Sequence, residues 1–190
     1  MNFLEIRAEV LRLTNRPDKT TSTDIAINKA VSYCTLKGSF RRDLVEASLA
    51  VDATLYGDTV SIAGFTRFRR FTYVKPTGVK KYLTFLAEDK IFTPKDQMQP
   101  NVYYVAGTSL TYTLSALTPT LEVGYLTYAP TLDAITNIDY WMFDIMPYAI
   151  IDLAAAMVFA GIGDDASANR HERLGMEFYN TLKRDLAIQE

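Results

Sequence analysis

The sequence is poor in the residues that most active sites and metal centres require. It has one cysteine, Cys34, and one histidine, His171, among 190 residues. A single cysteine excludes an internal disulfide, which fits assembly in a reducing cytosol. One cysteine and one histidine cannot supply the ligands of a structural zinc site. A Ser-His-Asp or Cys-His arrangement would have to use His171. Because this residue lies in the stripe of a helical segment, we predict a packing or surface role for it.

The sequence also lacks a strong charge of one sign. With 20 Lys and Arg against 22 Asp and Glu, the net charge is −2, whereas a nucleic-acid-binding protein normally has a basic excess. Residues 1–43 carry 8 basic and 5 acidic side chains, and residues 44–130 carry 8 and 7. Residues 131–190 carry 4 and 10. This acidic last third argues against contact with phosphates there, because like charges repel.

No hydrophobic run is long and uninterrupted enough to indicate a membrane span. The most apolar stretch is Ile145–Ile162, which contains Pro147 and Asp152 and is rich in alanine. Its marginal length and its charge favour a buried helix of a bundle over a membrane span. Pro147 is expected in the first turn, where proline is tolerated, and the helix is expected to end near Phe159.

Apolar residues with helical spacing open the sequence and predict an amphipathic helix over Asn2–Thr14. They recur at intervals of three and four: Phe3, Ile6, Val10 and Leu13. A second helix is predicted from Thr21 to Gly38, because Thr21 and Asp24 have the spacing of a capping box. Cys34 lies on the apolar stripe of this helix, so we predict a buried thiol and not a nucleophile.

Two more helices are predicted on either side of the long apolar one. Asn137 or Asp139 could cap a short helix before it, and Asp164 or Asp165 could cap the last helix, where a carboxylate suits the helix dipole. Gly175 indicates the close approach of another helix. The apolar stripe of the last helix is expected to contain Ala168, His171, Leu174, Phe178, Leu182 and Leu186.

The middle of the chain, from about Leu44 to Ala129, has the alternation typical of strands. An antiparallel hairpin is predicted for two alternating segments, SLTYTLSAL and LEVGYLTY, which are separated only by TPT. A third strand, VYYVA before Gly107, would complete a three-stranded meander. Earlier candidate strands are ATLY, TVSI, RFRRFTYV and KYLTF. We therefore predict an α+β protein in which terminal helices pack as a small bundle with an inserted antiparallel β lobe. The expected parts are residues 1–43 and 131–190 for the bundle and residues 44–130 for the lobe.

Candidate catalytic groups are few. The chain has no G-x-S-x-G elbow, no P-loop and no dinucleotide-binding glycine pattern. Carboxylate pairs for glycoside hydrolysis need not be close in sequence, so Glu46, Glu88, Asp89 and Glu122 stay candidates. Nothing marks two of them as a pair. We predict a non-enzymatic protein with no cofactor and no metal, and a cell-wall glycoside hydrolase carried in a virus particle is the alternative.

The segment RFRRF contains the most conspicuous cluster of basic side chains in the sequence. It interleaves Arg67, Arg69 and Arg70 with Phe68 and Phe71, a pattern that could stack nucleic-acid bases. Arginine is also the charged residue most enriched in protein–protein contacts. We favour an interface role for the three arginines.

Three stretches resemble the head-to-tail adaptor (connector) proteins of short-tailed bacteriophages. SFRRDLVEA, with Phe40, Arg42, Asp43 and Leu44, resembles their passage from the second helix into the β region. Residues 103–130 resemble their strand–Gly–strand–strand–Tyr-x-x-x-Pro pattern. YWMFDIMPYAIIDLAAAMVFAGIGDDASA resembles their closing helices.

This resemblance implies a structural role in the virion. Such adaptors form a ring, commonly of twelve copies, beneath the portal, and the ring extends the DNA channel and carries the tail nozzle or tail tube. DNA passes through without sequence-specific binding, and no membrane is involved. The resemblance places the protein in the neck between capsid and tail, after assembly in the host cytoplasm. It also implies portal binding through the C-terminal segment, with Leu182, Leu186 and Ile188 as interface residues. A tail-completion protein is a further alternative.

Overall fold

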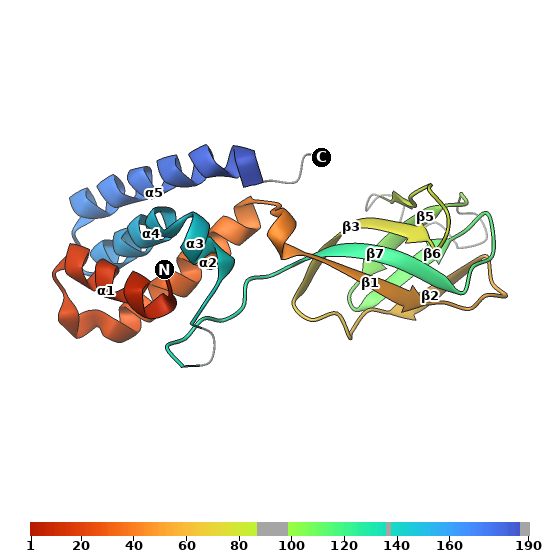
Figure 1. Cartoon of the computed structure of the whole chain (residues 1–190), viewed down its shortest axis with the longest axis horizontal. Helices are drawn as coiled ribbons and strands as arrows, with labels where there is room; N and C mark the ends of the chain where they lie inside the picture. Colours follow the sequence, from red (N-terminus) through yellow and green to blue (C-terminus); the bar gives the residue numbers. More distant parts are fainter. Residues whose placement is uncertain (87–98, 136–137, 187–190) are drawn as a thin grey trace. The chain divides into compact units, whose positions relative to one another are not determined.

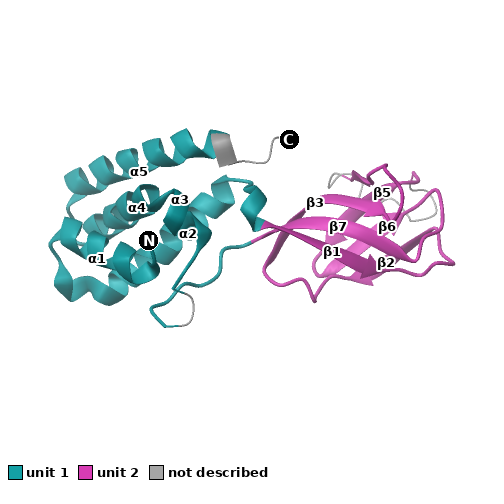
Figure 2. Ribbon diagram, in the orientation of Figure 1, with its two compact units in different colours: residues 1–43, 128–190 teal, residues 44–127 magenta. Residues whose placement is uncertain are grey.

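The computed structural model describes residues 1–86, 99–135 and 138–186, and it has the predicted α+β fold with terminal helices and mainly antiparallel sheets (Figure 1). The chain divides into two compact units (Figure 2). The helical unit consists of residues 1–43 and 128–190, and the β unit consists of residues 44–127. The β unit is thus inserted between two parts of one helical bundle.

The helical unit is built around one apolar helix. Its elements are α1 (Phe3–Thr14), the 3-10 turn Pro17–Lys19, α2 (Thr20–Lys37), the 3-10 turn Arg41–Asp43, α3 (Trp141–Ile145), α4 (Pro147–Gly161) and α5 (Asp165–Leu186). Helix α4 packs against α1, α2 and α5. Nine of its fifteen residues are buried, which confirms the prediction of a buried bundle helix. Pro147 occupies its first turn, as expected.

Helix ends follow the predictions only in part. Asp164 caps α5 by accepting a hydrogen bond from the backbone N–H of Ser167 at 3.0 Å, as predicted. The predicted capping box of α2 is wrong. The turn at Pro17 starts the helix at Thr20, so Thr21 and Asp24 lie inside it, and no side chain caps it. Asp139 does not cap α3, because Tyr140 precedes that helix and makes no cap bond, and Asn137 lies outside the described residues.

The α4–α5 contact is close because one residue in it has no side chain. A Cβ atom on Gly175 would lie 2.8 Å from Cγ of Leu153, 3.0 Å from the backbone nitrogen of Leu153 and 3.2 Å from the carbonyl oxygen of Ala149. The prediction of close approach at Gly175 is therefore confirmed. The predicted stripe of α5 needs one correction. Tyr179 is 1% exposed and faces the core, whereas Phe178 is 44% exposed.

The β unit is made of two sheets around one core. Its strands are β1 (Leu44–Ala50), β2 (Gly57–Ser61), β3 (Phe68–Pro76), β4 (Thr84–Phe85), β5 (Val102–Ala106), β6 (Ser109–Thr113) and β7 (Thr120–Thr127). One sheet has the order β1-β7-β3 and the other β2-β6-β5-β4. Side chains of both sheets fill the core, among them Phe71, Val74, Leu110, Tyr112, Leu121 and Val123. This arrangement is a sandwich, with an apolar face on each sheet.

Two predictions for the β unit are wrong. Strands β6 and β7 do not form a hairpin, because β7 lies between β1 and β3 and has no free edge for β6. Of the predicted meander, only the β5–β6 hairpin around Gly107 exists. ATLY is not a strand. Asp52 accepts a hydrogen bond from the backbone N–H of Thr54 at 2.8 Å and holds a turn there. The first strand is β1, whose mostly exposed residues gave little alternation to recognise.

Candidate functional site

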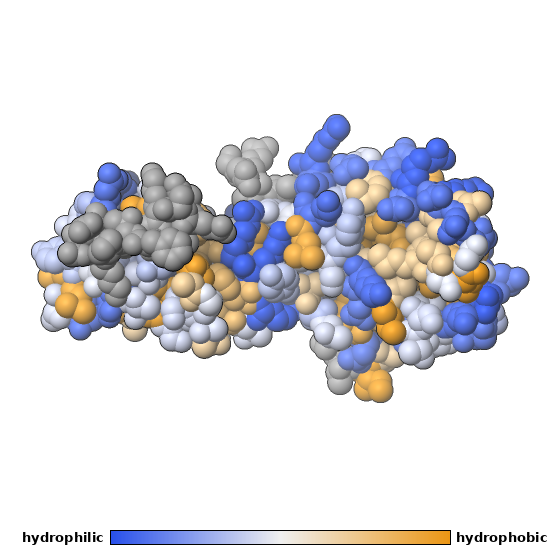
Figure 3. Space-filling view, turned by 180° about the vertical axis from the view of Figure 1, so that it is seen from behind, coloured by the Kyte–Doolittle hydropathy of each residue, from blue (hydrophilic) through white to orange (hydrophobic). Residues whose placement is uncertain are grey.

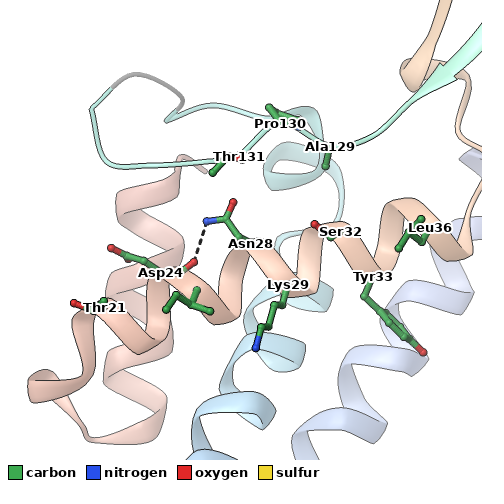
Figure 4. A pocket seen from close by; sticks show the side chains of 11 residues that line it. Thr21, Asp24, Asn28, Lys29, Ser32, Tyr33, Leu36, Ala129, Pro130 and Thr131 are labelled. Atoms are coloured by element: carbon green, nitrogen blue, oxygen red, sulfur yellow. Dashed lines mark hydrogen bonds between the residues drawn. The ribbon is translucent and has the colours of Figure 1, made fainter. Parts of the chain in front are cut away.

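The helical unit has a groove on its surface (Figure 4). It is open, has a volume of about 590 Å³, and is formed by the outer side of α2 and by residues 129–131. Its lining includes Thr21, Asp24, Ile25, Asn28, Lys29, Ser32, Tyr33 and Leu36 from α2. The groove therefore combines apolar side chains with a few polar ones, which is the usual character of a binding surface.

Asn28 fixes the wall of this groove. Its side-chain carbonyl accepts a hydrogen bond from the backbone N–H of Leu132 at 2.7 Å, and its amide donates to the carbonyl of Leu132 at 2.9 Å. Leu132 is 2% exposed and Asn28 is half-buried, so both bonds are partly screened from water. The amide also donates to the carbonyl of Asp24 at 3.0 Å. These bonds tie residues 129–132 to α2 and hold the groove open in a defined shape.

The floor of the groove presents two exposed apolar side chains and one cation. Ile25 and Leu36 are each 52% exposed. The Asp24 carboxylate pairs with the guanidinium of Arg7 at 3.3 Å. The Lys29 ammonium, in contrast, has no hydrogen bond or ion pair with any residue that the structure describes. A partner for the groove would therefore be apolar with an acidic group at its edge.

The predicted interface arginines lie at the start of β3. Arg67 precedes the strand with a left-handed backbone (φ 52°), and the β3–β7 register shifts between Phe68 and Arg70. Phe71 is 9% exposed and packs in the core of the β unit. Arg69 and Arg70 line a hollow of about 390 Å³. Because Phe71 is packed inside, the segment does not present two free rings for base stacking, and the interface role of the arginines stays a prediction.

The single histidine and the single cysteine have structural surroundings. Nδ1 of His171 lies 2.7 Å from Oδ1 of Asp152, and its ring stacks on Phe159 with the ring centroids 5.3 Å apart. Cys34 is fully buried, and this burial raises the pKa of its thiol to about 12. A thiol of that pKa is protonated at neutral pH and is a poor nucleophile. The packing role predicted for both residues is confirmed.

The carboxylates considered for hydrolysis are engaged within their own sheet. Glu46 accepts a hydrogen bond from the hydroxyl of Tyr73 at 3.0 Å. Glu122 pairs with the ammonium of Lys75 at 2.7 Å. Glu88 and Asp89 lie outside the described residues. Glu46 and Glu122 thus each have a cross-strand partner on β3, as is usual for polar side chains on the outer face of a sheet.

Metal ligation and membrane insertion can be examined directly in the described chain. Within residues 1–86, 99–135 and 138–186, no three His, Cys, Asp or Glu side chains come together in a way that could hold a metal ion. None of the helices in these ranges is long and apolar enough to cross a lipid bilayer.

Comparison with known proteins decides the family. A family model described as SU10 adaptor protein matches residues 1–189. The chain belongs to the SU10 adaptor protein family. The resemblance to head-to-tail adaptors is thereby confirmed, and this SU10 adaptor protein is a structural adaptor of a phage. No curated protein matches the chain at a significant level.

The functional sites of a SU10 adaptor protein are the surfaces through which it meets other particle components. Of the predicted C-terminal contact residues, Leu182 is half-buried and packs against the core of the helical unit. Leu186 ends α5, and its side chain lies outside the description, as does Ile188. The structure therefore brings Leu182 into the bundle and leaves the other two as predictions.

Sequence reasoning missed two surfaces of this adaptor. One is the α2 groove, whose Ile25 and Leu36 lie off the buried stripe of α2 and so indicated nothing by themselves. The other is an exposed aromatic pair: Tyr148 on α4 is 62% exposed, Phe178 on α5 is 44% exposed, and their ring centroids are 6.0 Å apart. Figure 3 shows apolar residues side by side between hydrophilic ones on the helical unit. Neither surface had a signal in the sequence, since Phe178 was assigned to the buried stripe of the last helix.

Proposed function

We propose that this adaptor forms the ring that joins the portal to the tail and extends the DNA channel in the virion neck. The ring has twelve copies, binds the portal on one side and the tail nozzle or tail tube on the other, and assembles in the host cytoplasm. The observation that carries the proposal is the family match, which spans residues 1–189 and therefore both units.

Exposed apolar surface on the helical unit supports a role in assembly. Tyr148 and Phe178 are exposed next to each other, and adjoining exposed apolar side chains are typical of contact sites. In a closed ring, each copy uses two different surfaces, one toward each neighbour. The groove on α2 and the aromatic pair on α4 and α5 are two such surfaces, formed by different elements of one unit.

The charge of the chain supports passage of DNA without binding. Residues 131–190 carry 10 acidic and 4 basic side chains, and a channel surface of this kind would repel phosphates. DNA could then slide past at a low cost, since tight non-specific binding requires lysine or arginine contacts with phosphates.

The test is assembly on the portal of the same phage. The purified adaptor is mixed with purified portal rings, and the complexes are separated by gel filtration and imaged by electron microscopy, with portal alone as control. We expect one additional ring per portal with twelve adaptor copies. An intact portal that retains no adaptor would contradict the proposal. Binding to the tail tube alone would instead indicate a tail-completion protein.

The contribution of the C-terminal segment can be tested in the same assay. Because the resemblance to head-to-tail adaptors implies portal binding through the C-terminal segment, Ile188→Asp should reduce portal binding, and the unfolding transition of the variant is measured beside it. Retention of full portal binding by this variant would place the portal contact elsewhere on the adaptor.

A further inference from the structure

We propose that neighbouring copies of this chain meet by seating the Tyr148–Phe178 pair of one copy in the α2 groove of the next, with Glu177 of the first facing Lys29 of the second. This inference rests on the proposed ring function and names the surface that builds the ring. It follows from three features of the helical unit. These are an open groove with exposed apolar side chains, a pair of exposed aromatic rings, and two opposite charges that have no described ion-pair partner.

The groove needs an occupant from another molecule. Its exposed side chains Ile25 and Leu36 lie on the outer side of α2, whereas the buried stripe of α2 packs against α4. Ile25 and the buried Cys34 are nine residues apart, which at about 100° per residue places them on opposite sides of the helix. Neither Tyr148 nor Phe178 lines the groove of its own chain.

The aromatic pair is a suitable occupant. Tyr148 and Phe178 come from two helices that Gly175 brings into close contact, and their rings pack at 6.0 Å with an interplanar angle of 37°. The two rings therefore support each other and form one apolar projection with few internal degrees of freedom. Aromatic anchors of this kind typically occupy the centre of an interface, where they lie in a pocket of the partner.

Charge complementarity selects the second copy over an unrelated partner. The Lys29 ammonium in the groove and the Glu177 carboxylate beside Phe178 have no hydrogen bond or ion pair with any described residue. Glu177 is exposed, and its backbone carbonyl accepts a hydrogen bond from the hydroxyl of Thr181. Among the described residues, each copy thus has an unpaired cation at the groove and an unpaired anion one residue away from the aromatic pair. A contact between unlike surfaces repeats from copy to copy and forms a ring when the rotation closes, whereas a contact between like surfaces ends at a dimer.

Charge reversal provides a test that only a copy-to-copy contact can pass. In the Lys29→Glu variant, two acidic side chains would meet at the proposed contact, and in the Glu177→Lys variant two basic ones would meet. Copies of either variant alone should therefore repel each other at this contact. We expect each to form at least tenfold fewer rings on the portal than the natural protein. An equimolar mixture should recover ring formation, because every contact in an alternating ring then pairs opposite charges. The double variant Lys29→Glu/Glu177→Lys should also recover it.

Matched controls separate this effect from net charge. Glu172→Lys changes the charge on another face of α5, and Lys80→Glu changes it in the β unit. Both side chains are exposed, and both variants should assemble like the natural protein. Circular dichroism of all variants checks that the fold is retained, which is expected because every altered side chain is on the surface.

Cysteine cross-linking gives a second, independent readout. Cys34 is buried and stays unreactive, so Lys29→Cys and Glu177→Cys each add one reactive thiol. Oxidation of the assembled mixture should give covalent dimers, and oxidation of either variant alone should give none. Failure of the proposed function has a different signature: the natural protein would then form no ring at all. If it forms rings, but single reversals assemble normally or the mixture does not recover, the contact proposed here is wrong and the ring proposal stands.

Discussion

Asp43 joins the end of the first helical segment to the start of α3, and its removal should destabilise the helical unit. Its side chain is 6% exposed, and Oδ1 accepts hydrogen bonds from the hydroxyl of Tyr140 at 2.8 Å and from Nε1 of Trp141 at 2.7 Å. A hydrogen bond to a charged group contributes about 1.5–3 kcal/mol net, and a buried donor left without a partner costs about 1–3 kcal/mol. Because Tyr140 and Trp141 are only half-buried, water can partly replace the carboxylate. We therefore expect Asp43→Ala to lower the free energy of unfolding by about 2–4 kcal/mol.

The assay is urea unfolding followed by fluorescence. Trp141 is the only tryptophan of the chain, so its emission reports directly on this contact. Tyr140→Phe removes one of the two bonds and should cost about 1–2 kcal/mol. Asp18→Ala is the control, since that carboxylate is on the surface and pairs only with Arg16, and it should leave the midpoint nearly unchanged. A loss below about 0.5 kcal/mol for Asp43→Ala, the range of ordinary surface substitutions, would show that water or a neighbour replaces the carboxylate and that the reasoning is wrong.

Three further predictions concern other contacts. Gly175→Val should destabilise the helical unit by about 1–3 kcal/mol, because the added side chain overpacks against backbone atoms. Gly161→Ala is the control and should be neutral or stabilising, because an added Cβ there meets nothing within 4 Å. Thermal unfolding measures both effects. Asn28→Ala should cost about 2 kcal/mol, one for each hydrogen bond to the Leu132 backbone, in the same measurement. Tyr73 should ionise late, because burial and the neighbouring Glu46 carboxylate raise its pKa to about 12. Its neutral form is favoured in the folded state, so the associated stability is present below pH 10 and is lost as the pH rises through 12. The absorbance difference at alkaline pH between the natural protein and Tyr73→Phe measures this directly, and a difference that appears already near pH 10 would contradict it.

The helices could be predicted because their apolar spacing is local. Phe3, Ile6 and Val10 lie within three turns, and all three are buried as the pattern indicated. Strand pairing was different. TPT between two alternating segments is a sound hairpin signal, but β7 has both edges occupied by β1 and β3. Which strand occupies an edge depends on residues more than forty positions away, so no short pattern contains that information.

The candidate interface could be predicted even less. The wall of the groove exists because Asn28 binds the backbone of Leu132, which is 104 positions away. Phe178 was assigned to the apolar stripe because it is aromatic, but the close α4–α5 contact at Gly175 turns Tyr179 inward and Phe178 outward. A one-position error on a helix rotates the expected face by about 100°. That rotation separates a core residue from an interface residue.

The β unit begins and ends at neighbouring points. Leu44, its first residue, pairs with Leu126, next to its last residue. Because the two ends of the β unit lie side by side, a lobe of different length could replace it without changing the distance between its two junctions with the helical unit. Phages that share this bundle are therefore free to diversify the whole lobe as a unit, by recombination at two adjacent junctions, while the bundle retains its contacts. The lobes of related adaptors should accordingly differ in size and sequence far more than the helices that carry them.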